Sequence, residues 1–276
     1  MNKLSKNLAY FFILMMLILV ILCALAPYIT RYDPIKVSMS EKMLSMSFDH
    51  WLGTDVLGRD LFTRVLYGGR TSILLSIIIV MFSLTLGGFI GLVSGYFGGK
   101  VDLAITNLTS IFQGLPGMSM MLAISAMLGP GVKSLMIALI FTSWTSFSRI
   151  VRGEVLKVKN KPYVMGAKVM GASSSRIIIR YILPNIMPNL IVVFASKVAS
   201  TMLSIAGLSY LGLGVQPPTP DWGSMINEAR VGFRSHPLLM IAPGMAILIV
   251  SLGINYSAEL FRDYLQRKNR NKQELT

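Results

Sequence analysis

KPYVMGAKVMGASSSRIIIRYILP, residues 161–184, is a basic and weakly apolar insert between strongly apolar segments. It contains no apolar run near the ~20 residues that a membrane-spanning helix needs, so we expect it to lie outside the bilayer. Pro162 suits the first turn of a helix, and Gly171 can end that helix after about two and a half turns. A serine at 173, 174 or 175 then caps a second short helix that runs toward Leu183. The sequence therefore predicts a rigid surface knob of two short helices joined by a glycine bend.

The composition is that of an integral membrane protein. The chain has 276 residues, of which 53% are hydrophobic and 14% charged, and its mean hydropathy is +0.63. Soluble proteins average about 25% charged residues. The net charge of +14 raises the question of nucleic-acid binding. Most Lys and Arg residues fall in segments expected to face the cytoplasm, which is the positive-inside bias of a membrane protein. We therefore expect membrane lipid, and no nucleic acid, around the chain.

Six apolar segments predict six transmembrane helices and an all-α fold. Lysines precede the first segment and a basic tail follows the last, so both termini are expected in the cytoplasm of a multi-pass plasma-membrane (cell inner membrane) protein. A secretory signal peptide cleaved near residues 24–26 is the alternative for the first segment, although its apolar run is longer than a typical signal sequence. The expected spans are residues 8–29, 73–96, 101–128, 134–150, 186–211 and 238–258.

Residues 31–70 are expected to form an extracytoplasmic loop that ends in a helix lying in the membrane interface. Apolar and charged side chains alternate there at helical spacing, which is typical of a surface brace before the next span. A ligand site is the alternative interpretation. The apolar residues are Leu61, Phe62, Val65 and Leu66, and the charged residues are Arg59, Asp60, Arg64 and Arg70.

Glycines recur every four residues in the second span and predict close helix packing. Gly87, Gly91, Gly95 and Gly99 share one helix face, which lets a second helix approach its backbone. They do not form a phosphate-binding loop: although Lys100 follows Gly99, Ser94 and Val101 occupy positions where a Walker A sequence needs glycine and serine or threonine. We expect no ATP site on this chain.

Polar side chains in the spans suggest a translocation path. The third span carries Asn107 and Gln113, which either line a pore or hydrogen-bond to other helices. Lys197 lies near the middle of the fifth span and either faces the protein interior or a path, or extends toward the interface from a lower position. Trp144, late in the fourth span, has the default interpretation of an interfacial anchor.

The residue order of the knob resembles the cytoplasmic coupling loop of ABC-importer permeases, written E-A-A, three residues, G, nine residues, I-x-L-P. Ala167, Gly171, Leu183 and Pro184 match the motif, whereas Met165 replaces the glutamate, Gly166 an alanine and Tyr181 the isoleucine. An ordinary amphipathic cytoplasmic loop is the alternative. The resemblance implies that ATPase coupling involves a set of mostly small residues. They are Tyr163, Met165, Gly166, Ala167, Gly171 and Ala172.

Two further segments look like the same group of permeases. They are HWLGTDVLGRDLFTRVLYGGRTS at 50–72 and SYLGLGVQPPTPDWGSMINEAR at 209–230, whose prolines and glycines predict an outer loop with an amphipathic turn. The chain thus resembles the C-type permease subunit of a dipeptide, oligopeptide or nickel ABC importer. This implies an N-terminal helix and extracytoplasmic loop (1–70), a permease core of five helices with the coupling loop at 160–184 (71–265), and a basic cytoplasmic tail (266–276).

The resemblance also implies partners: a second permease that forms a heterodimer, two cytoplasmic ATPases that hold ATP and Mg²⁺, and an extracytoplasmic solute-binding protein. We expect this chain to be a non-catalytic subunit without a cofactor, because the spans hold almost no carboxylates and the histidines, His50 and His236, lie in separate loops. An ion-coupled secondary transporter is a distant alternative, since neither inverted repeats nor intramembrane acids are visible. The run SMINEAR at 224–230, followed by HPLLMIAPG at 236–244, looks closer to nickel and metal-chelate permeases. Peptides are the alternative substrate.

Overall fold

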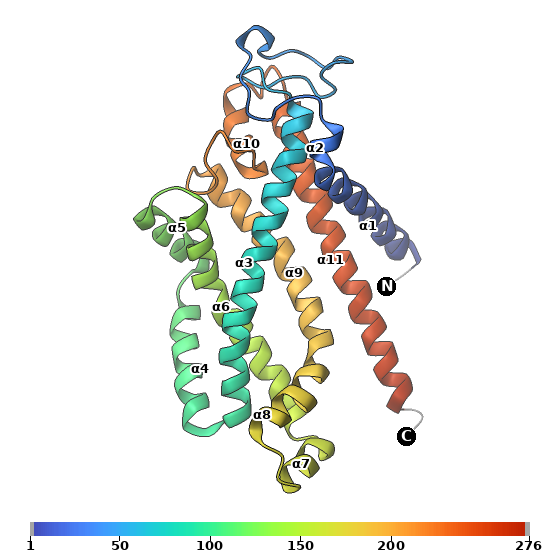
Figure 1. Cartoon of the computed structure of the whole chain (residues 1–276), viewed down its shortest axis with the longest axis vertical. Coiled ribbons are helices and arrows are strands. Elements are labelled where there is room, and N and C mark those ends of the chain that lie inside the picture. The colour runs from blue at the N-terminus through green and yellow to red at the C-terminus, as the bar shows by residue number, and fades with distance from the viewer. Residues whose placement is uncertain (1–2, 274–276) are drawn as a thin grey trace. The chain divides into compact units, whose positions relative to one another are not determined.

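The structure, a computed structural model, describes residues 3–273. Within this range the chain is all-α, with no β-strand beyond an isolated bridge between Thr54 and Asp60. The long helices are α1 (Lys3–Ala24), α3 (Leu61–Phe97), α6 (Val132–Lys159), α9 (Leu183–Tyr210) and α11 (Leu238–Gln273) (Figure 1). The short helices are α2 (Ala26–Ile29), α4 (Gly99–Gly114), α5 (Gly117–Leu128), α7 (Pro162–Val169), α8 (Ser174–Ile177) and α10 (Trp222–Glu228). Of the expected tail 266–276, residues up to 273 continue α11 and 274–276 lie outside the described residues.

Five helices of the described chain are long and apolar enough to cross a membrane, and the count rises to six if the bent pair α4 and α5 is taken as one span. The single helix expected over 101–128 is wrong, because α4 and α5 bend by 83° at a short break. Pro116 explains the break. A proline disfavours helical backbone in the residue before it, and Leu115 is extended at φ −86° and ψ 138°.

Helix α3 corrects the expected interfacial helix before the second span. Its first turns continue without a break into the span. Leu61 and Leu66 lie in the hydrophobic core, and Arg59, Asp60 and Arg64 are also buried. An interfacial helix would leave these charged groups in water, whereas here Arg59 and Arg64 pair with carboxylates and Asp60 contacts His50 Nδ1 at 2.9 Å.

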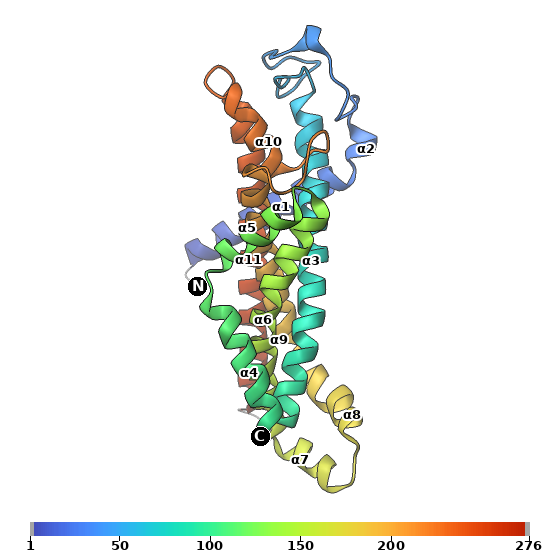
Figure 2. The ribbon, with the colours of Figure 1, turned by 90° about the vertical axis from the view of Figure 1, so that its left-hand side faces the viewer.

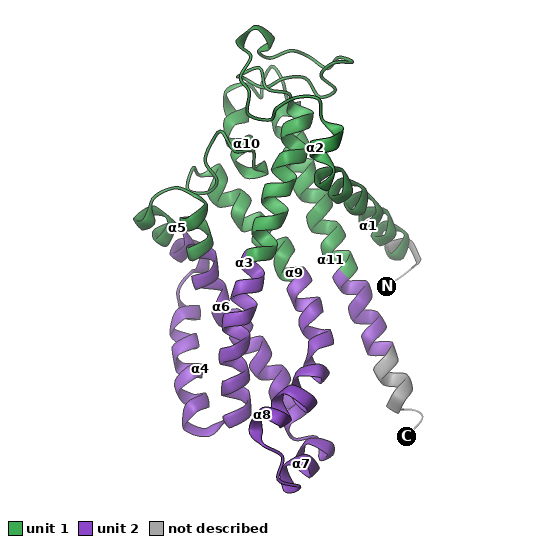
Figure 3. Ribbon diagram, in the orientation of Figure 1, with its two compact units in different colours: residues 1–78, 122–137, 196–257 green, residues 79–121, 138–195, 258–276 purple. Residues whose placement is uncertain are grey.

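Two compact units divide the chain, and parts of α3, α6, α9 and α11 belong to each (Figure 3). Unit 1 comprises residues up to Ile78, Leu122–Ile137 and Ser196–Ser257. Its core surrounds Trp222, which is fully buried among Cys23, Leu66 and Val250. Gly69 makes room for the indole, since a Cβ there would lie 2.7 Å from the ring, and the Trp222 Nε1–H donates to the Val65 carbonyl at 2.8 Å.

Unit 2 comprises Ile79–Met121, Ala138–Ala195 and the residues from Ala258 onward. Valines of α6 form its core with side chains from α7, α8, the segment Ile178–Ile182 and the start of α9. The buried members of this core are Val151, Val155, Val158, Val164, Ile177, Ile182, Ile186 and Leu190. Trp144 also belongs to this unit. The expectation that it anchors α6 in the interface is wrong, because it is buried and packs edge-on against Phe112, with ring centroids 5.7 Å apart.

Candidate functional site

Helix α7 and the turn after it form the first part of the knob. Pro162 occupies the first turn of α7, as expected from its fixed φ and missing N–H. Gly171 follows the helix at φ +80°, a conformation that favours glycine. The Gly171 N–H donates to the Lys168 carbonyl at 3.1 Å, and the Ala172 N–H donates to the Ala167 carbonyl at 3.1 Å. These two bonds are a Schellman motif, which fixes the direction in which the chain leaves α7.

Helix α8 forms the second part of the knob. The Ser173 hydroxyl accepts from the Arg176 N–H at 3.4 Å, so the serine cap is confirmed. The second helix is not separate from the fifth span, because the chain continues through a π-helical segment (Ile178–Ile182) into α9. The Leu183 N–H donates to the Ile178 carbonyl in this wider turn. Pro184 has no N–H to donate to the carbonyl four residues earlier, so the regular helical hydrogen bond is missing at this position. The wider π-helical turn lies beside this missing bond.

The knob has a buried base and an exposed apolar surface. Val164 and Ile177 are buried against the α6 valines. Ala167, expected to admit a partner, is also buried within the protein. Ala172 is partly buried against the same core. Tyr163, Met165, Gly166 and Gly171 remain exposed. The two most exposed apolar side chains of the knob are Val169 (87%) and Met170 (81%), which the sequence analysis did not single out.

The knob protrudes from unit 2. In two views at right angles, α7 lies beyond the ends of α3, α4 and α6 that belong to the same unit (Figures 1 and 2). Exposed apolar side chains on a protruding element with a buried base are typical of a docking surface. The basic residues Lys161, Lys168, Arg176 and Arg180 lie on the same element.

The glycine face of α3 contacts the backbone of α6 within unit 2. A Cβ on Gly87 would overlap the Trp144 carbonyl oxygen, and a Cβ on Gly91 would lie 2.9 Å from the Ser148 carbonyl carbon. At Gly95 it would lie 2.9 Å from the Val155 Cβ. Gly99 does not belong to this face: it starts α4 at φ +54° with nothing within 4 Å.

Substituting alanine for Gly91 is expected to destabilise the protein by about 1–3 kcal/mol, the usual range for overpacking. The methyl group would meet backbone atoms of α6 that cannot rotate away. Gly88→Ala is the matched control, because its nearest neighbours would lie at 3.8 and 3.9 Å and alanine favours a helix by up to about 1 kcal/mol. Thermal unfolding of both purified variants measures the difference. Equal melting temperatures would contradict the close contact.

An ion pair joins α4 to α6 beside the glycine face. Arg152 donates from Nε and Nη2 to the two Asp102 oxygens at 2.5 and 2.6 Å. The Ser94 hydroxyl on α3 donates to the same carboxylate at 2.5 Å. The sequence alone does not relate Asp102 to Arg152, since nothing local connects positions 50 residues apart. The pair ties three helices of unit 2 together.

The residues expected to line a path differ in exposure. Asn107 on α4 is exposed, whereas Gln113 on α4 and Lys197 on α9 are half-buried. None of the three side chains makes a hydrogen bond or ion pair with the side chains described between residues 6 and 267. Lys197 belongs to unit 1, whereas Asn107 and Gln113 belong to unit 2.

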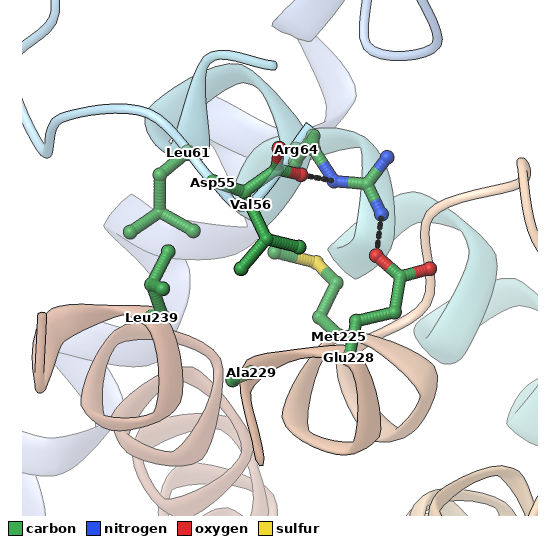
Figure 4. A pocket seen from close by; sticks show the side chains of 8 residues that line it. All are labelled: Asp55, Val56, Leu61, Arg64, Met225, Glu228, Ala229 and Leu239. Carbon is green, nitrogen blue, oxygen red and sulfur yellow. Dashed lines mark hydrogen bonds and ion pairs between the residues drawn. The ribbon is translucent and has the colours of Figure 1, made fainter. Parts of the chain in front are cut away.

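A buried ionic cluster organises the loops of unit 1. Asp55 and Glu228 lie on either side of Arg64 (Figure 4). Arg59 donates to Asp55 at 2.6 Å and to Glu228 at 2.5 Å, and Arg64 donates to Glu228 at 3.0 Å. Both arginine side chains are at most 2% exposed. Two positive and two negative charges balance, as a buried cluster requires. The cluster fixes α10 to the loop before α3.

Asp221 fixes the start of α10 by a second set of buried contacts. Its carboxylate accepts from the Ser224 N–H at 3.1 Å, an N-cap, and from the Ser72 hydroxyl at 2.7 Å. The side chain is fully buried. Burial raises the pKa of the Asp221 carboxyl above its ordinary value, although hydrogen bonds, led by that from Ser72, oppose this shift.

Asp221→Asn is expected to flatten the pH dependence of stability. The folded-state pKa of Asp221 is raised, so its contribution to stability is complete below the unfolded pKa of about 3.9 and is lost as the pH rises through the folded value. Asparagine has no such titration and remains a good N-cap. Melting temperatures of both proteins between pH 4 and 7 test this. Parallel curves would show that Asp221 does not titrate in this range.

The two histidines lie in different environments of unit 1. His50 is buried, its Nδ1 lies 2.9 Å from Asp60 Oδ1, and its ring stacks on Tyr32. His236 contacts the Ser235 hydroxyl at 3.2 Å and lines a mainly apolar cavity of about 360 Å³ with Met46 and Leu52. In the part of the chain that the structure describes, no group of three or more His, Cys, Asp or Glu residues is placed to hold a metal ion.

The chain is similar to a known family of membrane transport proteins. Residues 87–271 match the model for the binding-protein-dependent transport system inner membrane component. The dipeptide transport system permease protein DppC of Alkalihalophilus pseudofirmus is 34% identical over 97% of this chain and 88% of its own length. The oligopeptide transport system permease protein OppC of Bacillus subtilis is 33% identical over 96% of this chain and 87% of its own length.

Solved structures show the same fold. A chain of the MetNI methionine ABC transporter, in an inward-facing conformation, superposes with a TM-score of 0.61 at 15% identity. The match covers 74% of this chain and 97% of that one. The chain therefore belongs to the binding-protein-dependent transport system inner membrane component family, the permease subunits of ABC importers, and resembles within it the C-type permeases of the dipeptide and oligopeptide group.

Proposed function

We propose that this permease subunit imports dipeptides or oligopeptides. The observation that carries the proposal is the similarity, over nearly the whole chain, to permeases named for dipeptide and oligopeptide transport. The expected preference for nickel or a metal chelate finds no support in those names. It was based partly on the run SMINEAR, and Ser224, Met225 and Glu228 of that run have structural contacts that account for them.

In this proposal the knob transmits force between the membrane and a cytoplasmic ATPase. The contact surface comprises Tyr163, Met165, Gly166 and Gly171, to which the structure adds Val169 and Met170. Its buried base supports this role, because movement of the knob is passed to α6 and α9 through a packed core. Because Met165 stands where the motif has glutamate, the contact between the knob and the ATPase relies on apolar packing at this position.

The same proposal assigns the other partners and the orientation. A second permease completes the path, two ATPases hold ATP and Mg²⁺, and an extracytoplasmic solute-binding protein delivers the peptide. The knob and both termini face the cytoplasm, in accord with their excess of Lys and Arg. Asn107, Gln113 and Lys197 line the path, where a lysine ammonium suits a peptide carboxylate. The chain itself carries no catalytic group.

Uptake by a strain that lacks this gene tests the substrate. Labelled dipeptide and labelled nickel are supplied at limiting concentration, with and without the restored gene. We expect the gene to restore dipeptide uptake and to leave nickel uptake unchanged. If the gene restored nickel uptake alone, the peptide proposal would be wrong and nickel or a metal chelate would be the substrate.

A further inference from the structure

A small cavity in unit 1 is not used by any feature described above. It opens where the chain leaves α2 and enters the loop that leads to α3, and its volume is about 40 Å³. Four aromatic residues line it: Tyr32, Phe48, Trp51 and Phe62. Two of these rings, Trp51 and Phe62, lie against each other with centroids 4.9 Å apart. Aromatic faces attract cations through their quadrupoles.

Two carboxylates also line this cavity. Asp60 is buried and held in place, because its oxygens contact His50 Nδ1 at 2.9 Å and accept from the Thr63 N–H at 2.8 Å. Asp49 is exposed, and no side chain described between residues 6 and 267 makes a hydrogen bond or ion pair with it. Loss of water contact raises the pKa of the Tyr32 phenol, and Asp49, Asp60 and Glu41 raise it further. Two carboxylates, Asp49 and Asp60, and one cation, Arg31, line the cavity, so its lining carries more negative than positive charge.

We propose that this cavity binds a primary ammonium group, with Asp49 as the charged partner and the rings of Tyr32, Trp51 and Phe62 as its walls. Carboxylates and aromatic faces together are suited to an organic cation. The volume of about 40 Å³ exceeds the ~10–15 Å³ that one water molecule needs but is far below the ~300 Å³ of the smallest ligand pockets, so the cavity takes the head of a ligand and leaves the remainder outside. Arg31 lies where it can contact an anionic group of the same ligand.

Two sources supply this chemistry: the ethanolamine headgroup of a phospholipid and the amino end of a soluble peptide. The cavity includes Ile29, the last residue of α2, and Thr30, which follows it, so it lies near the expected membrane surface. The proposed ammonium site does not rest on the proposal that the permease imports peptides, because a lipid headgroup and a soluble amine present the same ammonium group.

Saturation-transfer NMR with the purified full-length chain in phosphatidylglycerol nanodiscs tests the proposal, with methylammonium as the probe. We expect transfer to the methyl protons, with at least tenfold weaker binding in Asp49→Asn and a loss in Trp51→Leu. Asp33→Asn is the control, because Asp33 is exposed in the same loop and does not line the cavity. The absence of transfer, or equal binding by Asp49→Asn and the wild type, would overturn the proposal.

Competition identifies the source. Displacement of methylammonium when phosphatidylethanolamine is added to the nanodiscs indicates a lipid headgroup. Displacement by dialanine but not by N-acetyl-dialanine indicates a soluble amine. Displacement by N-acetyl-dialanine as well as by dialanine would show that the ammonium group is not what is recognised, and would contradict the proposal.

Discussion

Replacing Gly171 by valine is expected to reduce peptide uptake to the background of a strain that lacks the gene, while the protein still inserts and folds. Gly171 has φ +80°, and a Cβ at this position would have no neighbour within 4 Å, so the obstacle is the backbone conformation and not space. A left-handed conformation costs an ordinary residue about 1–2 kcal/mol, and a β-branched residue is a stronger outlier. The turn must therefore change its path. Val164 and Ala167 hold α7 in the core, so the displacement falls on Val169 and Met170 at the docking surface.

Two further variants separate coupling from general strain. Gly129→Val is the matched control, because Gly129 has φ +82° and equally open surroundings but lies between α5 and α6. We expect it to retain uptake. Gly171→Asn should recover part of the uptake, since asparagine tolerates the left-handed region better than valine. Uptake and membrane abundance are measured for each. Normal uptake by Gly171→Val would show that the knob does not couple transport to an ATPase.

Glu228→Ala is expected to lower the free energy of unfolding by about 3–5 kcal/mol, the range for removing one partner from a buried ion cluster. Arg59 and Arg64 are almost completely buried and would then share only Asp55. One buried positive charge is left without compensation, and α10 loses its attachment to the loop before α3. Thermal unfolding of the purified protein measures the loss.

Two comparisons show whether charge balance is the cause. The double variant Arg64→Leu with Glu228→Leu is expected to be more stable than Glu228→Ala, because the Asp55–Arg59 pair at 2.6 Å remains neutral. Lys157→Ala removes the pair with Glu154 through a side chain that is 69% exposed, and should cost under about 1 kcal/mol. If Glu228→Ala melted at the same temperature as Lys157→Ala, the cluster would not stabilise the loops.

Local rules predicted much of the knob. Pro162, Gly171 and Ser173 each have a positional preference set by their own backbone or side chain, and the structure has them at a helix start, a left-handed turn and an N-cap. The break at Pro116 follows from the same kind of rule. The sequence analysis nevertheless expected a single helix over 101–128, because the segments on both sides of Pro116 are apolar.

The buried contacts could not be predicted in this way. Arg59 and Arg64 resemble the polar side of an interfacial helix until Glu228, 169 and 164 residues away, is brought beside them. Arg152 and Asp102 present the same problem across 50 residues. Whether a charge lies in water or in the core depends on such distant partners, which periodicity does not reveal. The burial of Ala167 was missed for a related reason, since the sequence of α7 alone does not show which of its faces packs inward.

The most direct test of ATP-driven peptide import is accumulation of a labelled dipeptide by the complex that co-purifies with this chain, reconstituted in proteoliposomes. ATP is supplied on the ATPase side and the solute-binding protein on the other. The account predicts accumulation only when both are present, and its loss in Gly171→Val. Accumulation without ATP, driven by an imposed proton gradient, would contradict the account and identify an ion-coupled transporter.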